Sequence, residues 1–365
     1  MADPWPMIRG MRRWPWLATC VVVGILPAAE DLALPQPLNA MELSSPLDPA
    51  KPSGYHDSHS TLGLGPLRLS SQSPGQSLRL GLIPHTPADL ATGEMKAYIG
   101  SSWVNVWANH RQYALDYESL TSEALLAYGI NSSWAFEVGA LSRVTFGGHL
   151  DGVIQRFHEV FGIDQDGRDT VPQNQTSIRI DPNGTQPGLL LGAEELDGNR
   201  TTFLRGALLW TLSHGEDGWP ATALAATLQA PIGDQRGYSG GLFDVSLDLS
   251  LAKPLGDWVG YATVTCTRFA ADQIYGIHLH RTNWAGFAAI EYRVTSDWSL
   301  VLQYLLSQGV APDLYVFSEP SHEVTLGTQV RVGRHTTLQL GLIENVFIFD
   351  NSPDFGVHLA LEMRL

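Results

Sequence analysis

From residue 94 onward, apolar and polar side chains alternate along the chain with a period of two. Between Phe243 and Leu251, for example, every second residue is Phe, Val or Leu, and the residues between them are Asp and Ser. Successive side chains of a β-strand point to opposite faces of its sheet. The pattern therefore predicts strands that have one apolar and one polar face.

This alternation recurs in twelve segments, each of which we expect to be a strand. The expected strands lie near residues 95–108, 120–129, 134–145, 202–213, 221–230, 241–252, 257–268, 284–294, 298–308, 322–332, 336–346 and 355–365. Their lengths suit tilted strands that cross a hydrocarbon layer about 30 Å thick. No covering layer of helices is expected beside them.

Short and long connections alternate between these segments. Short ones are expected near 214–220, 253–256, 295–297 and 333–335, and longer ones near 231–240, 269–283, 309–321 and 347–354. Bacterial outer-membrane barrels have short periplasmic turns and long extracellular loops. We therefore expect an all-β fold, an antiparallel transmembrane β-barrel of about 12 strands at residues 94–365, with both termini periplasmic. A soluble β-sandwich, whose apolar faces cover each other, remains the alternative.

The longest connection, residues 147–201, departs from the strand pattern and is expected on the outer side. Leu150, Ile154, Phe157 and Phe161 follow one another at helical spacing, which predicts a short amphipathic helix near 149–161. Its apolar face needs a partner. A helix folded into the barrel mouth would act as a plug or gate, and a helix packed on the rim or wall would not.

The N-terminal part has a different composition. Residues 1–29 read as a signal peptide, because Arg9, Arg12 and Arg13 precede an apolar run that ends at small residues. Residues 30–93 are expected to form a periplasmic segment. Within it, short apolar pieces interrupted by prolines could dock on the barrel mouth or enter the lumen.

Charge and cysteine content narrow the picture further. The formal net charge is −15, which argues against a nucleic-acid partner, because such proteins need a basic face. If the signal peptide is removed, Cys20 leaves with it and only Cys266 remains. No intramolecular disulfide is then expected, so strand closure has to provide the stability.

The sequence contains only weak motifs for catalysis or metal binding. Ser213 and His214 stand together at an expected turn, but no recognisable acid or amide accompanies them, so we expect no enzyme. The acidic stretch Asp164 to Asp169 resembles the start of a calcium loop, but Gln175 occupies the position of its final glutamate. We therefore expect no metal site and no cofactor.

The polar faces of the expected strands would line the lumen. The lumen-lining candidates are Asp244, Asp248, Glu291, Arg293, Gln303, Gln329, Arg331, Glu362 and Arg364. Charges of both signs could set the field that a polar solute meets. Alternatively, they pair with one another and simply fill a narrow interior.

Several stretches resemble an uncharacterised family of bacterial outer-membrane barrels, known only as a domain of unknown function. They are residues 147–158, Phe161-Gly162, 103–109, 128–130 and 228–234, the last of which is also similar to barrels thought to take up aromatic compounds. The resemblance covers roughly residues 65–365 and implies a barrel with no established activity. The chain departs from most such barrels in ending at Leu365 instead of Phe or Trp. The expected partners are outer-membrane lipid and the barrel assembly machinery. The different last residue bears on how that machinery recognises the chain.

Together these features predict an exported protein of the outer membrane. The leading hypothesis is passive or gated passage of a small solute through the barrel. A closed structural or surface-interaction barrel is the second hypothesis, and a membrane-embedded lipid hydrolase is the third. The sequence does not identify the solute.

Overall fold

The computed structural model describes residues 62–162, 167–181, 188–233, 237–240, 243–345 and 350–365. The signal peptide expected at residues 1–29, the rest of the segment up to residue 61, and the acidic residues Asp164 to Asp166 lie outside the described residues. No helix among the described ranges is long and apolar enough to cross a membrane.

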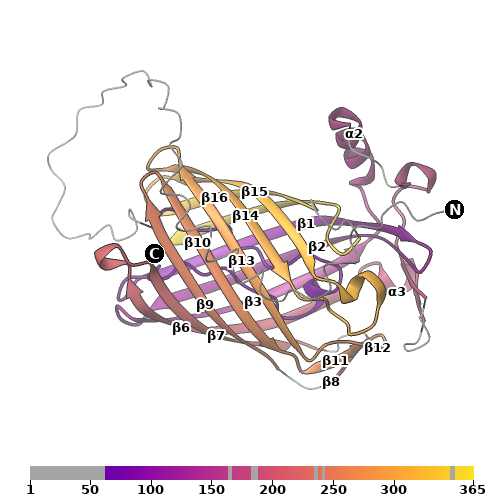
Figure 1. The fold of residues 1–365 in the computed structure, drawn as a ribbon, viewed down its shortest axis with the longest axis horizontal. Coiled ribbons are helices and arrows are strands. Elements are labelled where there is room, and N and C mark those ends of the chain that lie inside the picture. Colours follow the sequence, from indigo (N-terminus) through magenta and orange to yellow (C-terminus); the bar gives the residue numbers. More distant parts are fainter. Residues whose placement is uncertain (1–61, 163–166, 182–187, 234–236, 241–242, 346–349) are drawn as a thin grey trace, which may run out of the picture. The chain divides into compact units, whose positions relative to one another are not determined.

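Twelve antiparallel strands form one closed sheet (Figure 1). They are β1 (Met95–His110), β2 (Tyr113–Gly129), β3 (Trp134–Phe146), β6 (Arg200–His214), β7 (Ala221–Pro231), β9 (Asp244–Leu255), β10 (Trp258–Arg268), β13 (Thr282–Arg293), β14 (Trp298–Ser307), β15 (Ser321–Val332), β16 (Thr336–Glu344) and β17 (Phe355–Arg364). Strand β1 pairs with β2 on one side and with β17 on the other, which closes the barrel. The expected twelve-stranded barrel is confirmed, and the two-sheet sandwich is not the fold.

The two faces of the strands differ as the alternation predicts. In β14, Leu300 and Leu302 are exposed on the outside, whereas Ser299 and Gln303 are buried inside. Apolar side chains that are exposed all around a barrel suit a lipid environment. Each strand therefore contributes an apolar outer surface and a polar inner one.

The two ends of the barrel also differ. At one end, called here the short-turn end, tight connections such as 256–257 and 333–335 join the strands. Aromatic side chains gather there: Trp134 stacks on Trp210 with 5.4 Å between ring centroids, and Trp258 packs on Tyr292 at 4.6 Å. Tryptophan and tyrosine rings favour the membrane–water interface.

The opposite end, the long-loop end, carries elements that the sequence pattern did not predict. They are η4 (Arg168–Thr170), β4 (Ser177–Ile180), β5 (Leu189–Leu191), α3 (Ala193–Leu196), β8 (Tyr238–Gly240), β11 (Ala271–Ile274), β12 (Ile277–His278) and η6 (Tyr315–Ser318); a further turn, η5 (Glu216–Gly218), lies at the short-turn end. Strand β4 pairs with the first residues of β2, which begins at Tyr113 and so extends beyond the expected strand.

The predicted helix exists as α2 (Asp151–Phe161), but its position corrects the expectation of a plug or gate. Leu150 and Ile154 pack against Phe355. Phe355 and Leu359 are four residues apart in β17, so their side chains point to the same face of the sheet. Leu359 is 54% exposed on the outer surface of the barrel. The apolar stripe of α2 thus covers the outside of the barrel wall, as in the alternative that the sequence left open. The side chains of Phe157 and Phe161 are outside the described part of the chain.

Candidate functional site: the lumen and the segment inside it

Residues 62–93, called here the lumen segment, run inside the barrel, although the sequence analysis expected them in a periplasmic segment (Figure 1). Near the short-turn end, Tyr261 donates a hydrogen bond to the carbonyl of Leu62 at 2.5 Å. The segment reaches the long-loop end, turns at η3 (Gln76–Leu78) and returns to the short-turn end, where Asp89 pairs with Arg364 at 2.6 Å.

The two limbs of the lumen segment run side by side. Gly65, whose φ of +94° favours glycine, faces Thr86, and Gly81 faces the backbone of Ser71. At the turn, the side chain of Arg79 donates to the carbonyl of His280 at 2.6 Å and lies over the ring of Phe269. The turn is thereby fixed to the loops of the long-loop end.

Carboxylates of the barrel wall bind backbone N–H groups of the lumen segment. Glu291 accepts hydrogen bonds from the N–H of Leu64 at 2.9 Å and of Gly65 at 3.2 Å. Glu323 accepts from the N–H of Gln72 at 2.7 Å and from the hydroxyl of Ser71. Buried N–H groups outside a sheet need such acceptors, and charged acceptors give the stronger bonds.

Asp244 completes this set on the returning limb. It accepts hydrogen bonds from the N–H of Leu80 at 3.1 Å and from the N–H of Ala270 at 3.0 Å. One carboxylate therefore holds both the lumen segment and a connection of the long-loop end.

A buried charge network ties the middle of the segment to β2, β3 and β6. Arg68 pairs with Glu137 at 2.8 Å and with Glu123 at 3.6 Å, and Arg205 pairs with Glu123 at 3.0 Å. Burial alone would lower the pKa of Arg68, but the two carboxylates hold it above its usual value. Arg68 is therefore a permanent cation that anchors the segment.

His85 lies on the returning limb beside the same network. Its Nδ1 is 3.7 Å from a carboxylate oxygen of Glu137, and its side chain is almost fully buried. Burial lowers the pKa of His85, an effect that Glu137 opposes only in part. The neutral imidazole is thus favoured while the segment is in place.

Apolar contacts fill the space between the polar ones. Leu67 is fully buried against β15 and β16, at the inward positions of Gly327 and Gly341. A Cβ atom on Gly327 would lie only 2.4 Å from Cδ1 of Leu67, so a larger residue there would displace the leucine. Leu69 packs against Val104 and Ile343 in the same way.

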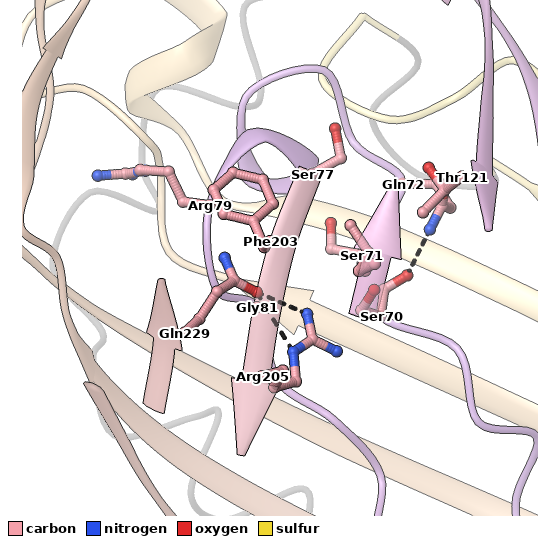
Figure 2. Close-up of a pocket in the computed structure, with 11 residues that line it drawn as sticks. Ser70, Ser71, Gln72, Ser77, Arg79, Gly81, Thr121, Phe203, Arg205 and Gln229 are labelled. Carbon is pink, nitrogen blue, oxygen red and sulfur yellow. Dashed lines mark hydrogen bonds between the residues drawn. The ribbon is translucent and has the colours of Figure 1, made fainter. Parts of the chain in front are cut away.

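The space left between the lumen segment and the wall is small. Beside Ser70 and Ser71, a cavity of about 10 Å³ borders Arg205 and Gln229, whose side chains are hydrogen-bonded at 2.8 Å (Figure 2). Such a volume holds about one water molecule. The lumen segment therefore leaves little space beside Ser70 and Ser71.

The lumen-lining candidates fall into three groups. Asp244, Glu291, Gln303 and Gln329 bind the lumen segment, the two glutamines through the N–H of Leu67 and the carbonyl of Gly65. Asp248 is buried and accepts a hydrogen bond from Ser246. The remaining four candidates lie near the short-turn end. Arg293 donates to the carbonyl of Gly256, and Arg331 pairs with Asp297. Glu362 and Arg364 form a charged cluster with Lys96 and Asp89.

Three residues that the sequence reasoning missed are central to this arrangement: Arg68, Glu137 and Glu323. The signal that could have pointed to them is a polar residue at an inward position of a strand, which both glutamates occupy. At the turn after β6, the hydroxyl of Ser213 accepts a hydrogen bond from the N–H of Gly215, and His214 is exposed. This turn geometry carries no argument for a hydrolase.

Comparison with known proteins agrees with the fold. A family model described as "Protein of unknown function (DUF3187)" matches residues 55–365, and no curated protein matches the chain. An outer membrane channel from Pseudomonas putida F1 is similar in structure, with a TM-score of 0.50 and 12% identity over 78% of this chain and 100% of that one.

Two other structures are similar at lower scores. The NanC porin has a TM-score of 0.43 and 8% identity over 74% of this chain and 100% of its own. A mutant of TodX, a monoaromatic hydrocarbon channel, has a TM-score of 0.36 and 12% identity over 82% of this chain and 98% of its own. At these identities the likeness concerns the barrel fold and no activity.

Proposed function

We propose that this chain, which belongs to the DUF3187 family of unknown function and folds as an outer-membrane β-barrel, is a gated channel for a small solute. The observation that carries the proposal is the lumen segment, which fills the barrel interior without joining the barrel sheet. In this proposal the structure is the closed state. Displacement of the lumen segment toward the periplasm opens the passage.

The way in which the segment is held supports a movable gate. Its contacts to the wall are side-chain hydrogen bonds, ion pairs and packed leucines, whereas the barrel closes through β1 pairing with β2 and β17. Removal of the segment therefore breaks no strand pairing. The orientation follows from the loops, since short turns face the periplasm in such barrels.

A permanently closed structural barrel is the second candidate. The full burial of Leu67 and the charge network around Arg68 favour it, because a buried segment that is held by ion pairs is costly to release. The two candidates differ in one observable: only the channel passes a solute while its chain is intact.

Solute flux into liposomes tests the proposal. The intact protein and a variant that lacks residues 62–92 would be reconstituted, and swelling in isosmotic solutions of small neutral and charged solutes would be recorded. The variant keeps Gly93, whose N–H pairs with the carbonyl of Gly129. We expect slow swelling with the intact protein and fast swelling with the variant. No swelling with intact protein that is shown to be inserted would favour the structural barrel.

A further inference from the structure

A second cavity, of about 130 Å³, lies at the long-loop end next to the turn of the lumen segment. Pro74, Gly75 and Leu78 of the segment form part of its lining. The other walls are mainly apolar and include Leu115, Ile178, Leu189, Leu196, Ile277 and Phe317. Such a largely apolar lining favours a guest with an apolar body.

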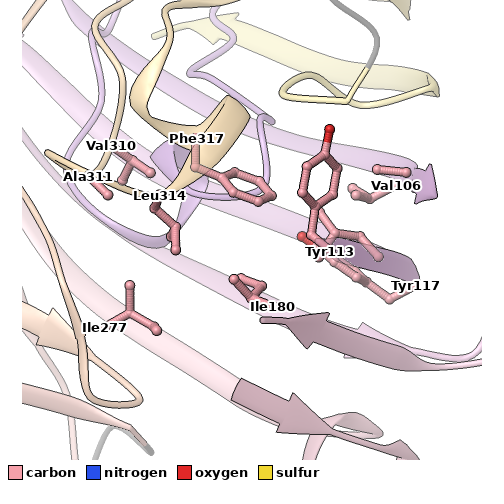
Figure 3. Packing of buried hydrophobic residues seen from close by; sticks show 11 residues of the cluster. Val106, Tyr113, Tyr117, Ile180, Ile277, Val310, Ala311, Leu314 and Phe317 are labelled. Atoms are coloured by element: carbon pink, nitrogen blue, oxygen red, sulfur yellow. The ribbon is translucent and has the colours of Figure 1, made fainter. Parts of the chain in front are cut away.

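Elements from distant parts of the chain build the apolar side. Ile180 of β4, Ile277 of β12, and Leu314 and Phe317 from the loop before β15 belong to one buried cluster (Figure 3). Phe317 meets the ring of Tyr113 edge-on, with 5.5 Å between centroids. The cavity is thus a built space between packed loops and strand ends.

The opposite side of the cavity is polar and contains one unpaired charge. Arg143 of β3 lies in register with Thr201 of β6, and both line the cavity. The side chain of Arg143 is only 3% exposed, and its Nη2 donates to the hydroxyl of Ser119 at 2.8 Å. Nε and Nη1 of Arg143 have no hydrogen-bond partner among the residues that the structure describes.

Three other largely buried arginines show what Arg143 lacks, whereas a fourth, Arg79, donates to backbone carbonyls. Arg68, Arg168 and Arg205 each have a carboxylate partner, at 2.8, 3.2 and 3.0 Å respectively. Among the described residues, no ion pair joins Arg143 to a carboxylate, and Glu323, which binds the lumen segment, acts on Arg143 only at longer range. A guanidinium stays protonated in a protein interior, and a buried charge without a counterion is strongly unfavourable.

We propose that this cavity is a binding site for a small monocarboxylate with an apolar body, whose carboxylate pairs with Arg143. The apolar body lies among the leucine and isoleucine side chains, where a fully polar anion such as inorganic phosphate would lose its hydration without compensation. A neutral hydrocarbon would leave Arg143 unpaired. Only a ligand with both features satisfies both walls.

The size of the cavity limits the ligand to about one ring. Benzene occupies an apolar protein cavity of about 150 Å³, so an aromatic carboxylate such as benzoate is the matching class. Because the lumen segment lines the cavity, a bound ligand would touch the gate. The proposal names the solute class of the proposed channel and rests on it only for the ligand's route, since binding itself needs no transport.

Calorimetric titration of the full, refolded protein tests the site with two probes, benzoate and benzyl alcohol. The probes share a ring and differ in charge. A charge-assisted hydrogen bond makes benzoate at least about tenfold tighter for the intact protein. The variant Arg143→Met should lose this preference while it keeps weak binding of benzyl alcohol, and Arg143→Lys should retain part of it.

Two further variants make the result specific. Arg179→Met removes an arginine of β4 that already pairs with Asp181 and should leave the preference unchanged. Ile178→Trp places an indole in the cavity and should weaken both probes. Heat-modifiable migration on gels verifies that each variant is folded.

The proposal is overturned if the intact protein binds benzoate no better than benzyl alcohol, if the preference survives Arg143→Met, or if Ile178→Trp leaves both affinities unchanged. The outcome is independent of the gating proposal. Binding without solute flux would reject the channel and keep the site, and flux without binding would reject the site and keep the channel.

Discussion

At the scale of single residues, the carboxylates of the barrel wall decide how firmly the lumen segment is held. Glu291, Glu323 and Asp244 each accept backbone N–H groups of the segment from an inward strand position. The sequence places these residues on polar strand faces, but the partners lie far away along the chain. A period of two therefore predicts that Glu291 faces inward, and it does not predict that Leu64 and Gly65 are bound there.

Substitution of Glu291 by Gln tests how strongly this carboxylate binds the lumen segment. The change keeps the shape and weakens two charge-assisted hydrogen bonds, so we expect the segment to lose about 1–3 kcal/mol of local stability. Hydrogen exchange of peptides that cover residues 62–70 should speed up by about fivefold or more. Glu118→Gln is the matched control, because Glu118 is equally buried and binds the N–H groups of His149 and Leu150 instead. Equal exchange in the two variants would contradict the assignment.

His85 makes the stability of the bound lumen segment dependent on pH. Burial lowers its pKa in the bound segment, whereas a released segment would have the ordinary value of about 6.5. The bound state then carries fewer protons, so its stability is present above pH of about 6.5 and is lost as the pH falls below that value. The protection factors of the segment, which correct for the slower intrinsic exchange at acid pH, should thus be smaller at pH 5.5 than at pH 7.5. In His85→Gln this pH dependence should shrink, and an unchanged dependence would show that another group is responsible.

At the scale of elements, the strands were predictable to within a few residues because their alternation is a local property. The exceptions are informative. Strand β2 starts at Tyr113, where Leu115 and Tyr117 are buried beneath loops instead of facing lipid. The short strands β4, β5, β11 and β12 carry too few residues for a period to appear. Helix α2 was predicted correctly, but its helical spacing cannot tell which surface it covers.

Because α2 lies outside the barrel, its detachment should leave the conductance of the barrel unchanged. The double variant Leu150→Asp, Ile154→Asp should detach the helix, because it places charges at two buried positions, a change that costs several kcal/mol. Limited proteolysis should then cleave the loop, while the conductance of the barrel stays that of the parent. Val160→Asp is the control on the same helix, since Val160 is 73% exposed. An increase in conductance on detachment would restore the plug role that the sequence suggested.

At the scale of the whole molecule, the closed barrel presents leucines to its surroundings and buries its polar side chains. As an outer-membrane barrel, the protein should hold the outer face of β14 in lipid. Leu302→Arg should then destabilise the inserted protein by about 2–4 kcal/mol in a urea refolding titration with vesicles. Leu190→Arg, at an exposed position of the short strand β5, should have little effect. Similar stabilities for both variants would contradict the membrane placement.

The central claim is that residues 62–93 close a barrel that is otherwise open. Single-channel conductance in a planar bilayer tests it most directly, with the intact protein compared with the variant that lacks residues 62–92. We expect brief or small openings of the intact protein and large, sustained steps after the deletion. A folded, inserted deletion variant that conducts no more than the intact protein would contradict it, because the lumen would then be closed by the barrel wall itself.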